Sequence, residues 1–134
     1  MNKIFTLIFF VLISTSTHAS ETILKVFENE AKKSDAKFAG FNISNGEKLF
    51  RMQRLHSSGE KVSCMTCHTD NPKNQGLTRA NKVIEPMATI ANKDRFTDMA
   101  KVEKWFKRNC NDVLERPCTI QEKGDFIKFM MSIK

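Results

Sequence analysis

The sequence has little of what would break regular structure or carry it across a membrane. Only five glycines and three prolines occur in 134 residues, and no long polar tract is present, which argues against a disordered chain or a second module. There is no internal repeat. The apolar stretch from Ile4 to Ile13 is shorter than the ~20 residues that a spanning helix needs. We therefore expect no stable membrane insertion.

The N-terminus has the features of an export signal. Lys3 precedes the apolar stretch, and serines and threonines follow it up to Thr17-His18-Ala19, an end suited to signal peptidase. We predict that residues 1–19 are removed and that the mature chain, 20–134, forms one periplasmic domain. A retained membrane anchor is the alternative, which the short apolar stretch disfavours.

The charge balance is basic. The formal charge is +7, and it becomes +6 in the mature chain because Lys3 is the only charged residue among residues 1–19. The lysines are spread along the sequence, so nucleic acid is not an expected partner, whereas an acidic redox protein or an anionic membrane surface is. No acid–base pair is placed for catalysis. An enzyme, such as a reductase of a small nitrogen or oxygen species, is therefore the less favoured class.

The run Cys64-Met65-Thr66-Cys67-His68 is a covalent haem attachment motif. Residues three apart lie on one face of a helical turn, so both thiols can reach the two vinyl groups of one porphyrin, and His68 can then bind the iron. A redox dithiol or half of a zinc site are the alternatives. Zinc would require a second ligand pair at similar spacing, but Cys110 and Cys118 are eight apart with no histidine nearby. We predict one covalently bound haem c.

Helical patterns dominate the remaining sequence. We expect helices at about 21–38, from Glu47 through Leu55, at about 98–110 and at about 120–133. Thr97 is the expected N-cap of the third helix, and Thr119 with Glu122 makes a capping box for the fourth. Residues 70–95 are expected to be irregular and to wrap the haem edge. Without a convincing strand pattern, these elements predict an all-α, class I cytochrome c-like fold around the haem.

The sixth ligand of the iron decides the function, because a methionine thioether would make a closed electron carrier. The methionine candidates are Met52, Met65, Met87, Met99, Met130 and Met131. Met87 is the best of them because it follows Pro86 in an irregular stretch, as a ligand in a loop does. His56 would give a bis-histidine site, but beside Ser57-Ser58-Gly59 it is better explained as a solvated loop residue.

Asn109 is a different kind of candidate. It shares a helical stripe with Val102, Trp105 and Phe106, which predicts that it faces the interior. A buried amide is costly without a partner, and iron is one available partner. The competing interpretation is that Asn109 caps a backbone group near the helix end, or lies in water at the rim.

The sequence resembles the sphaeroides haem protein family of small exported cytochromes. The resemblance covers most of the mature chain from about Gly46 onward, and it rests on the haem motif and on these segments: Asp94-Arg95-Phe96-Thr97-Asp98, Lys101-Val102-Glu103-Lys104-Trp105, Arg108-Asn109-Cys110-Asn111, Cys118-Thr119 and Glu122-Lys123. It implies that the Asn109 oxygen is the distal haem ligand and that Cys110 and Cys118 form a disulfide.

The resemblance also implies a function in electron transfer and ligand binding. Members are described as binding oxygen and nitric oxide when reduced, with a dihaem cytochrome c as electron donor. An amide oxygen suits hard ferric iron better than ferrous iron, so reduction should release Asn109 and open the site to such ligands. A conventional carrier with His68 and Met87 as ligands is the alternative, and ligand exchange to Met87 stays open.

Overall fold

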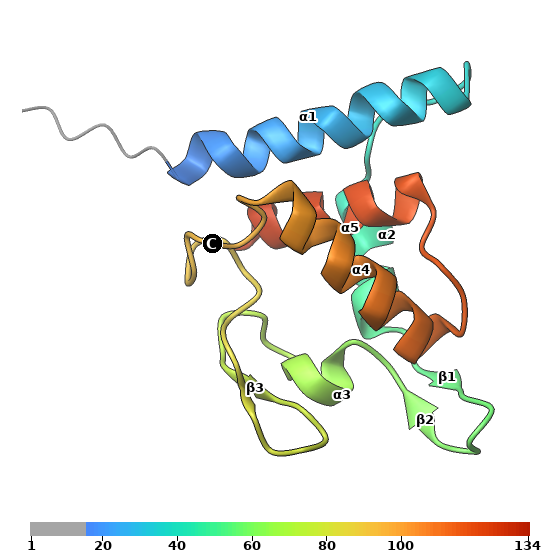
Figure 1. Ribbon diagram of the computed structural model, residues 1–134, viewed down its shortest axis with the longest axis vertical. Coiled ribbons are helices and arrows are strands. Elements are labelled where there is room, and N and C mark those ends of the chain that lie inside the picture. The colour runs from blue at the N-terminus through green and yellow to red at the C-terminus, as the bar shows by residue number, and fades with distance from the viewer. Residues whose placement is uncertain (1–15) are drawn as a thin grey trace, which may run out of the picture.

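The computed structural model describes residues 16–134, and these form an all-α fold with two very small hairpins (Figure 1). The helices are α1 (Ser16–Ser34), α2 (Ile43–Arg51), α3 (Met65–His68), α4 (Met99–Leu114) and α5 (Ile120–Ser132). Two antiparallel pairs join β1 (Arg54–Leu55) to β2 (Lys61–Val62), and β3 (Gly76–Leu77) to β4 (Val83–Ile84). The all-α prediction is confirmed. The predicted leader lies outside the described residues except for its last four, which belong to α1.

Polar side chains fix where the helices begin. Thr119 accepts a hydrogen bond from the Glu122 backbone and Glu122 accepts one from Thr119, so the predicted capping box is present. The predicted N-cap of α4 is wrong by one residue. Asp98 accepts from the backbone N of Lys101 at 3.1 Å, while the Thr97 hydroxyl donates to the Asp94 carbonyl at 2.8 Å. A carboxylate at this position also complements the positive end of the helix dipole.

The core lies where α2 and α5 pack closely, with α1 across α5 (Figure 1). Close contact of α2 and α5 requires glycine at position 46, because a Cβ there would lie 2.0 Å from the Asp125 carbonyl oxygen. Phe50 is fully buried with its ring centroid 6.0 Å from that of Phe129 and 6.2 Å from that of Phe126. These apolar contacts are the main stabilising force of the fold.

The helix expected from Glu47 through Leu55 ends earlier than predicted. Helix α2 stops at Arg51, and Met52 turns into extended backbone. Leu55 lies in β1 with 73% of its surface exposed, so the prediction that the helix continues through it is wrong. The hairpin formed by β1 and β2 leads the chain directly to the attachment motif.

Helix α1 covers the core with a stripe of Ile23, Phe27 and Ala31, which are four residues apart and all buried. It runs from residue 16 to 34 rather than from 21 to 38, and the Asp35 carboxylate accepts from the Lys37 backbone just after its end. Between residues 16 and 134, no helix is both long and apolar enough to cross a bilayer.

Candidate functional site

The attachment motif forms the short helix α3 and the residue before it. The backbone N–H groups of Cys67 and His68 both donate to the Cys64 carbonyl, at 3.3 and 3.1 Å, so the two thiols and the imidazole come from one helical turn. Ser63 is buried and donates its backbone N–H to the Thr66 hydroxyl at 2.9 Å. Cys64 and Cys67 are free, half-buried thiols. This arrangement could present both sulfurs to one porphyrin.

Burial sets the protonation of this motif. It raises the pKa of the Cys64 thiol to about 11, which disfavours the reactive thiolate of a redox dithiol. Burial, helped by the nearby charge of Arg95, lowers the pKa of His68 to about 4, so its imidazole is neutral at pH 7. Its buried Nδ1 has no hydrogen-bond partner among the described residues. A neutral imidazole with unused bonding capacity suits an iron ligand, so these residues fit a haem.

The chain after His68 is held tightly against the motif. Thr69 adopts a positive φ of 62° and ends α3 in a sharp turn. Gly76 then passes so close that a Cβ would lie 1.9 Å from the Cys67 carbonyl oxygen and 3.0 Å from the His68 Cα. The sequence prediction missed this role of Gly76, for which its only signal was a glycine in an irregular stretch.

The other metal-ligating residues do not gather around the motif. Across residues 16–134, no three histidine, cysteine, aspartate or glutamate side chains are grouped as a metal ion would require. Cys110 and Cys118 are bonded to each other instead. The donor set therefore suits a porphyrin with one histidine ligand better than a zinc site.

Helix α4 presents a different face from the one predicted. Its buried stripe is Val102, Phe106 and Cys110, spaced by four residues, so the interior position predicted for Asn109 is wrong. Asn109 and Trp105 lie on the neighbouring, exposed face. The Asn109 side chain has no hydrogen-bond partner in the described part of the chain, and the C-cap of α4 is Glu115. Asn109 therefore does not serve as a helix cap.

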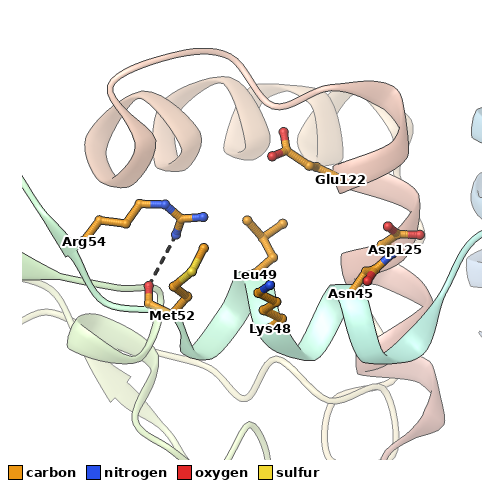
Figure 2. A pocket seen from close by; sticks show the side chains of 7 residues that line it. All are labelled: Asn45, Lys48, Leu49, Met52, Arg54, Glu122 and Asp125. Carbon is orange, nitrogen blue, oxygen red and sulfur yellow. Dashed lines mark hydrogen bonds between the residues drawn. The ribbon is translucent and has the colours of Figure 1, made fainter.

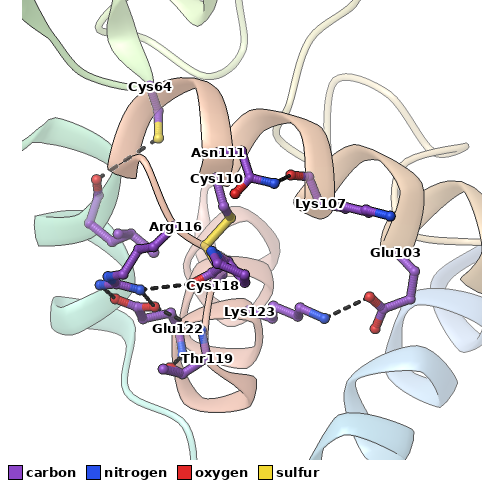
Figure 3. The surroundings of a disulfide bond; sticks show 12 residues. Cys64, Glu103, Lys107, Cys110, Asn111, Arg116, Cys118, Thr119, Glu122 and Lys123 are labelled. Carbon is purple, nitrogen blue, oxygen red and sulfur yellow. Dashed lines mark hydrogen bonds and ion pairs between the residues drawn. A yellow bond between two sulfur atoms is a disulfide. The ribbon is translucent and has the colours of Figure 1, made fainter. Parts of the chain in front are cut away.

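The disulfide between Cys110 and Cys118 is present, as the family resemblance implied (Figure 3). It joins α4 to the loop just before α5, with 5.6 Å between the two Cα atoms. Within the closed loop, Arg116 donates to both carboxylate oxygens of Glu122 at 2.8 and 2.6 Å. The residue next to Asn109 is thus covalently tied to the loop that leads into α5.

The end of α4 also contacts the hairpin before the motif. Glu115 has a positive φ of 54°, and its carboxylate accepts the Ser57 backbone N–H at 3.2 and 3.3 Å. Hydrogen bonding by the Ser57 side chain, assisted by its backbone N–H and by the charge of His56, lowers the pKa of Glu115. His56, the weaker ligand candidate, lies in the hairpin turn with its Nε2 3.6 Å from Glu115 and its Nδ1 3.0 Å from the Ser58 hydroxyl. The structure therefore places His56 in a polar loop, as predicted.

Met87, the alternative distal ligand, is buried within the apolar core cluster with 8% of its surface exposed. Its backbone N–H donates to the Pro72 carbonyl at 2.9 Å. Arg95 holds the same segment from the other side by donating to the carbonyls of Pro86, at 2.7 Å, and Glu85. These contacts are those of a packed, anchored methionine.

The short helix that presents two thiols and a neutral histidine, set in an all-α fold, defines a c-type cytochrome with one covalently bound haem. The comparisons with known proteins agree. A family described as a domain of unknown function, DUF1924, matches residues 36–130. The chain belongs to the sphaeroides haem protein family.

Two curated relatives support this assignment. The chain is 44% identical over 89 residues to the cytochrome c-type protein SHP of Cereibacter sphaeroides, a match that covers 66% of this chain and 69% of the relative. It is 34% identical over 117 residues to cytochrome c'' of Methylophilus methylotrophus, covering 87% and 81%.

Solved structures of both relatives have the same fold. Oxidised cytochrome c'' from Methylophilus methylotrophus superposes with a TM-score of 0.79 at 32% identity, covering 87% of this chain and 96% of that one. Oxidised SHP, an oxygen-binding cytochrome c, superposes with a TM-score of 0.72 at 36% identity, covering 83% and 94%.

Proposed function

We propose that this protein is a periplasmic electron-transfer cytochrome whose distal ligand leaves on reduction, so that the ferrous haem binds a small diatomic molecule. Cys64 and Cys67 would hold a haem through thioether bonds, and His68 and the Asn109 side-chain oxygen would be the ligands of its iron. When bound, the haem supplies an iron that changes oxidation state and accepts axial ligands.

The observation that carries this proposal is the position of Asn109. Its amide lies on a face of α4 that the protein core does not use, has no hydrogen-bond partner among the described residues, and precedes a disulfide-bonded cysteine. An amide that neither caps the helix nor packs in the core is available as a ligand. The disulfide ties the next residue to the loop before α5, so Asn109 could leave the iron without moving far.

The chemistry of the amide explains why release follows reduction. A neutral amide oxygen is a hard donor and interacts better with ferric than with ferrous iron. His68 stays neutral and can remain bound in both states, because burial lowers the pKa of its imidazole to about 4. His68 and Asn109 would therefore respond differently to reduction of the iron, with His68 retained and Asn109 released.

The relatives support a function of this kind. SHP is described as an oxygen-binding cytochrome c, and a solution structure of cytochrome c'' addresses the structural basis of haem-ligand detachment. By extension, we propose that the present chain binds oxygen or nitric oxide when reduced. Its electron donor would be another cytochrome, such as a dihaem cytochrome c, and its N-terminal 19 residues would be removed on export.

The test compares optical and spin-state spectra of the mature holoprotein with those of Asn109→Ala. Asn111→Ala is the matched control, because Asn111 lies on the same helix and its amide donates only to the Lys107 carbonyl, at 2.6 Å. Loss of six-coordinate ferric character in Asn109→Ala alone, with a ferrous wild type that binds carbon monoxide readily, supports the proposal. A ferrous wild type that stays six-coordinate and does not bind carbon monoxide would refute the proposal.

The same spectra separate the proposal from a conventional His68 and Met87 carrier. Such a carrier would show a sulfur-to-iron charge-transfer band in the ferric wild type, and Met87→Ala would abolish it. The buried, backbone-anchored position of Met87 favours a packing role, for which we expect no such band.

A further inference from the structure

A hollow of about 240 Å³ lies between α2, β1 and α5, outside the proposed ligand-binding site (Figure 2). Its lining residues are Asn45, Lys48, Leu49, Met52, Arg54, Glu122 and Asp125. Figure 2 shows Arg54 and Met52 reaching over one side of the hollow, with Glu122 opposite. Nothing in the proposed function uses these side chains.

The hollow is positively charged because its two carboxylates already have hydrogen-bond or ion-pair partners, whereas its two basic side chains have no acidic partner. Glu122 is held by Arg116 and by the Thr119 backbone. By contrast, no carboxylate within residues 16–134 lies at ion-pair distance from Lys48 or Arg54, and Arg54 donates only to the Met52 carbonyl, at 3.3 Å. Two uncompensated cations beside one hollow attract an anionic surface.

The second acid of the hollow is turned inward. Asp125 is 4% exposed, and its carboxylate accepts the Asn42 backbone N–H at 2.6 Å and the Gln121 amide at 2.8 Å. It is therefore committed to the junction of α2 and α5 and contributes little field outside the protein.

The hollow lies close to the first attachment cysteine. Leu49 lines it, and the Leu49 carbonyl oxygen is 3.9 Å from the Cys64 sulfur. Arg54 pairs with Val62 in the hairpin, two residues before that cysteine. A protein seated here would lie near the haem edge carried by Cys64. This placement matters because electron transfer weakens steeply with distance.

Exposed apolar groups accompany the charges. Met52 is 40% exposed beside the hollow, and Leu55, next to Arg54 in β1, is 73% exposed. Protein interfaces combine apolar contacts at the centre with a polar rim, and methionine adapts to differently shaped partners. The patch thus has both components of a transient protein interface.

We propose that the Lys48–Arg54 hollow is the docking site for an acidic face of the electron-donor protein. This inference rests on the proposed electron-transfer function and names where the electron enters. Lys48 and Arg54 steer the partner by long-range attraction, Met52 and Leu55 make the close contacts, and the reduced partner would donate one electron to the ferric haem that Cys64 and Cys67 would hold.

The test measures reduction rates of the ferric holoprotein by stopped flow with two reductants of opposite charge. Reduced flavodoxin is a small acidic protein, and reduced methyl viologen is a cation. The variant is Lys48→Gln/Arg54→Gln, and the charge-matched control is Lys33→Gln/Lys37→Gln, which neutralises two exposed lysines at the far end of α1 and just after it (Figure 1).

At low salt, we expect the hollow variant to slow reduction by flavodoxin by about tenfold and to leave reduction by methyl viologen equal or faster. The control should change either rate by less than about twofold, and the difference should vanish at high salt, where the Debye length is only a few ångströms. Equal slowing with both reductants would indicate a changed reduction potential and overturn the proposal. Equal effects of the two double variants, or salt-independent rates, would also overturn it.

This experiment is independent of the ligand-release proposal. Both double variants should bind carbon monoxide in the ferrous state as the wild type does. If the ferrous wild type did not bind carbon monoxide, the release of Asn109 would be refuted. The docking site would still be tested, because it depends on whether the hollow variant slows reduction by flavodoxin but not by methyl viologen.

Discussion

Opening the Cys110–Cys118 disulfide should destabilise the fold by an amount set mainly by the loop that the bond closes. The bond closes a loop of eight residues. In the chain-entropy picture, a loop of this length restricts the unfolded state by about 8 cal/mol/K, which corresponds to about 2.5 kcal/mol at 25 °C. For a domain of this size, that loss lowers the melting temperature by about 10 °C.

The choice of variant separates the cross-link from packing. Cys118→Ala removes the bond at a half-buried position and leaves the Cys110 sulfur in the core. We expect it to lose about 2.5 kcal/mol. The double variant Cys110→Ala/Cys118→Ala also loses the buried sulfur, which adds about 1 kcal/mol. The Asn109 ligand should also be held less firmly in both.

The assay is urea unfolding of the ferric holoprotein, followed by far-UV circular dichroism. The denaturant slope should rise in both variants, because an uncross-linked unfolded chain exposes more surface. A Cys118→Ala protein within about 0.5 kcal/mol of the wild type, with an unchanged slope, would contradict the cross-link argument. A loss confined to the double variant would assign the effect to packing of Cys110 instead.

Three further predictions follow from other contacts. Gly76→Ala, whose Cβ would lie 1.9 Å from the Cys67 carbonyl oxygen, should cost about 1–3 kcal/mol and lower the yield of covalent haem per chain, measured by haem stain. Asp125→Leu leaves the Asn42 backbone N–H and the Gln121 amide without their carboxylate acceptor and should cost about 1–3 kcal/mol in urea unfolding, whereas Asp125→Asn should cost less. The hydrogen bond from Arg116 lowers the pKa of Glu122, so its stabilising effect is present above the ordinary value of 4.5 and is lost as the pH falls through the lowered one. Unfolding measured over an acid-to-neutral series should show this loss in the wild type and less of it in Glu122→Gln.

The sequence predicted best those features that depend on neighbours in the chain. The haem motif and the Thr119–Glu122 capping box follow from spacing and side-chain type within one turn, and the helical fold follows from apolar periodicity. The N-cap of α4 was misplaced because Thr97 and Asp98 are both good caps, and only the tertiary geometry selects Asp98.

It was harder to predict which face of α4 is buried. Val102 and Phe106 belong to two possible stripes, one continuing to Asn109 and the other to Cys110. The structure selects Cys110, because its bond to Cys118 requires the cysteine to face α5. The tight passage of Gly76 over the motif joins residues whose approach no local pattern encodes. Both features depend on contacts between distant elements.

The four cysteines give this chain opposite requirements during its maturation. Of the single disulfides that four thiols can form, only the one between Cys110 and Cys118 leaves both attachment thiols reduced for thioether formation. Burial raises the pKa of Cys64 to about 11. Little Cys64 thiolate is therefore present to attack the disulfide and exchange with it. The folded chain thus protects Cys64 from the oxidising conditions that join Cys110 to Cys118.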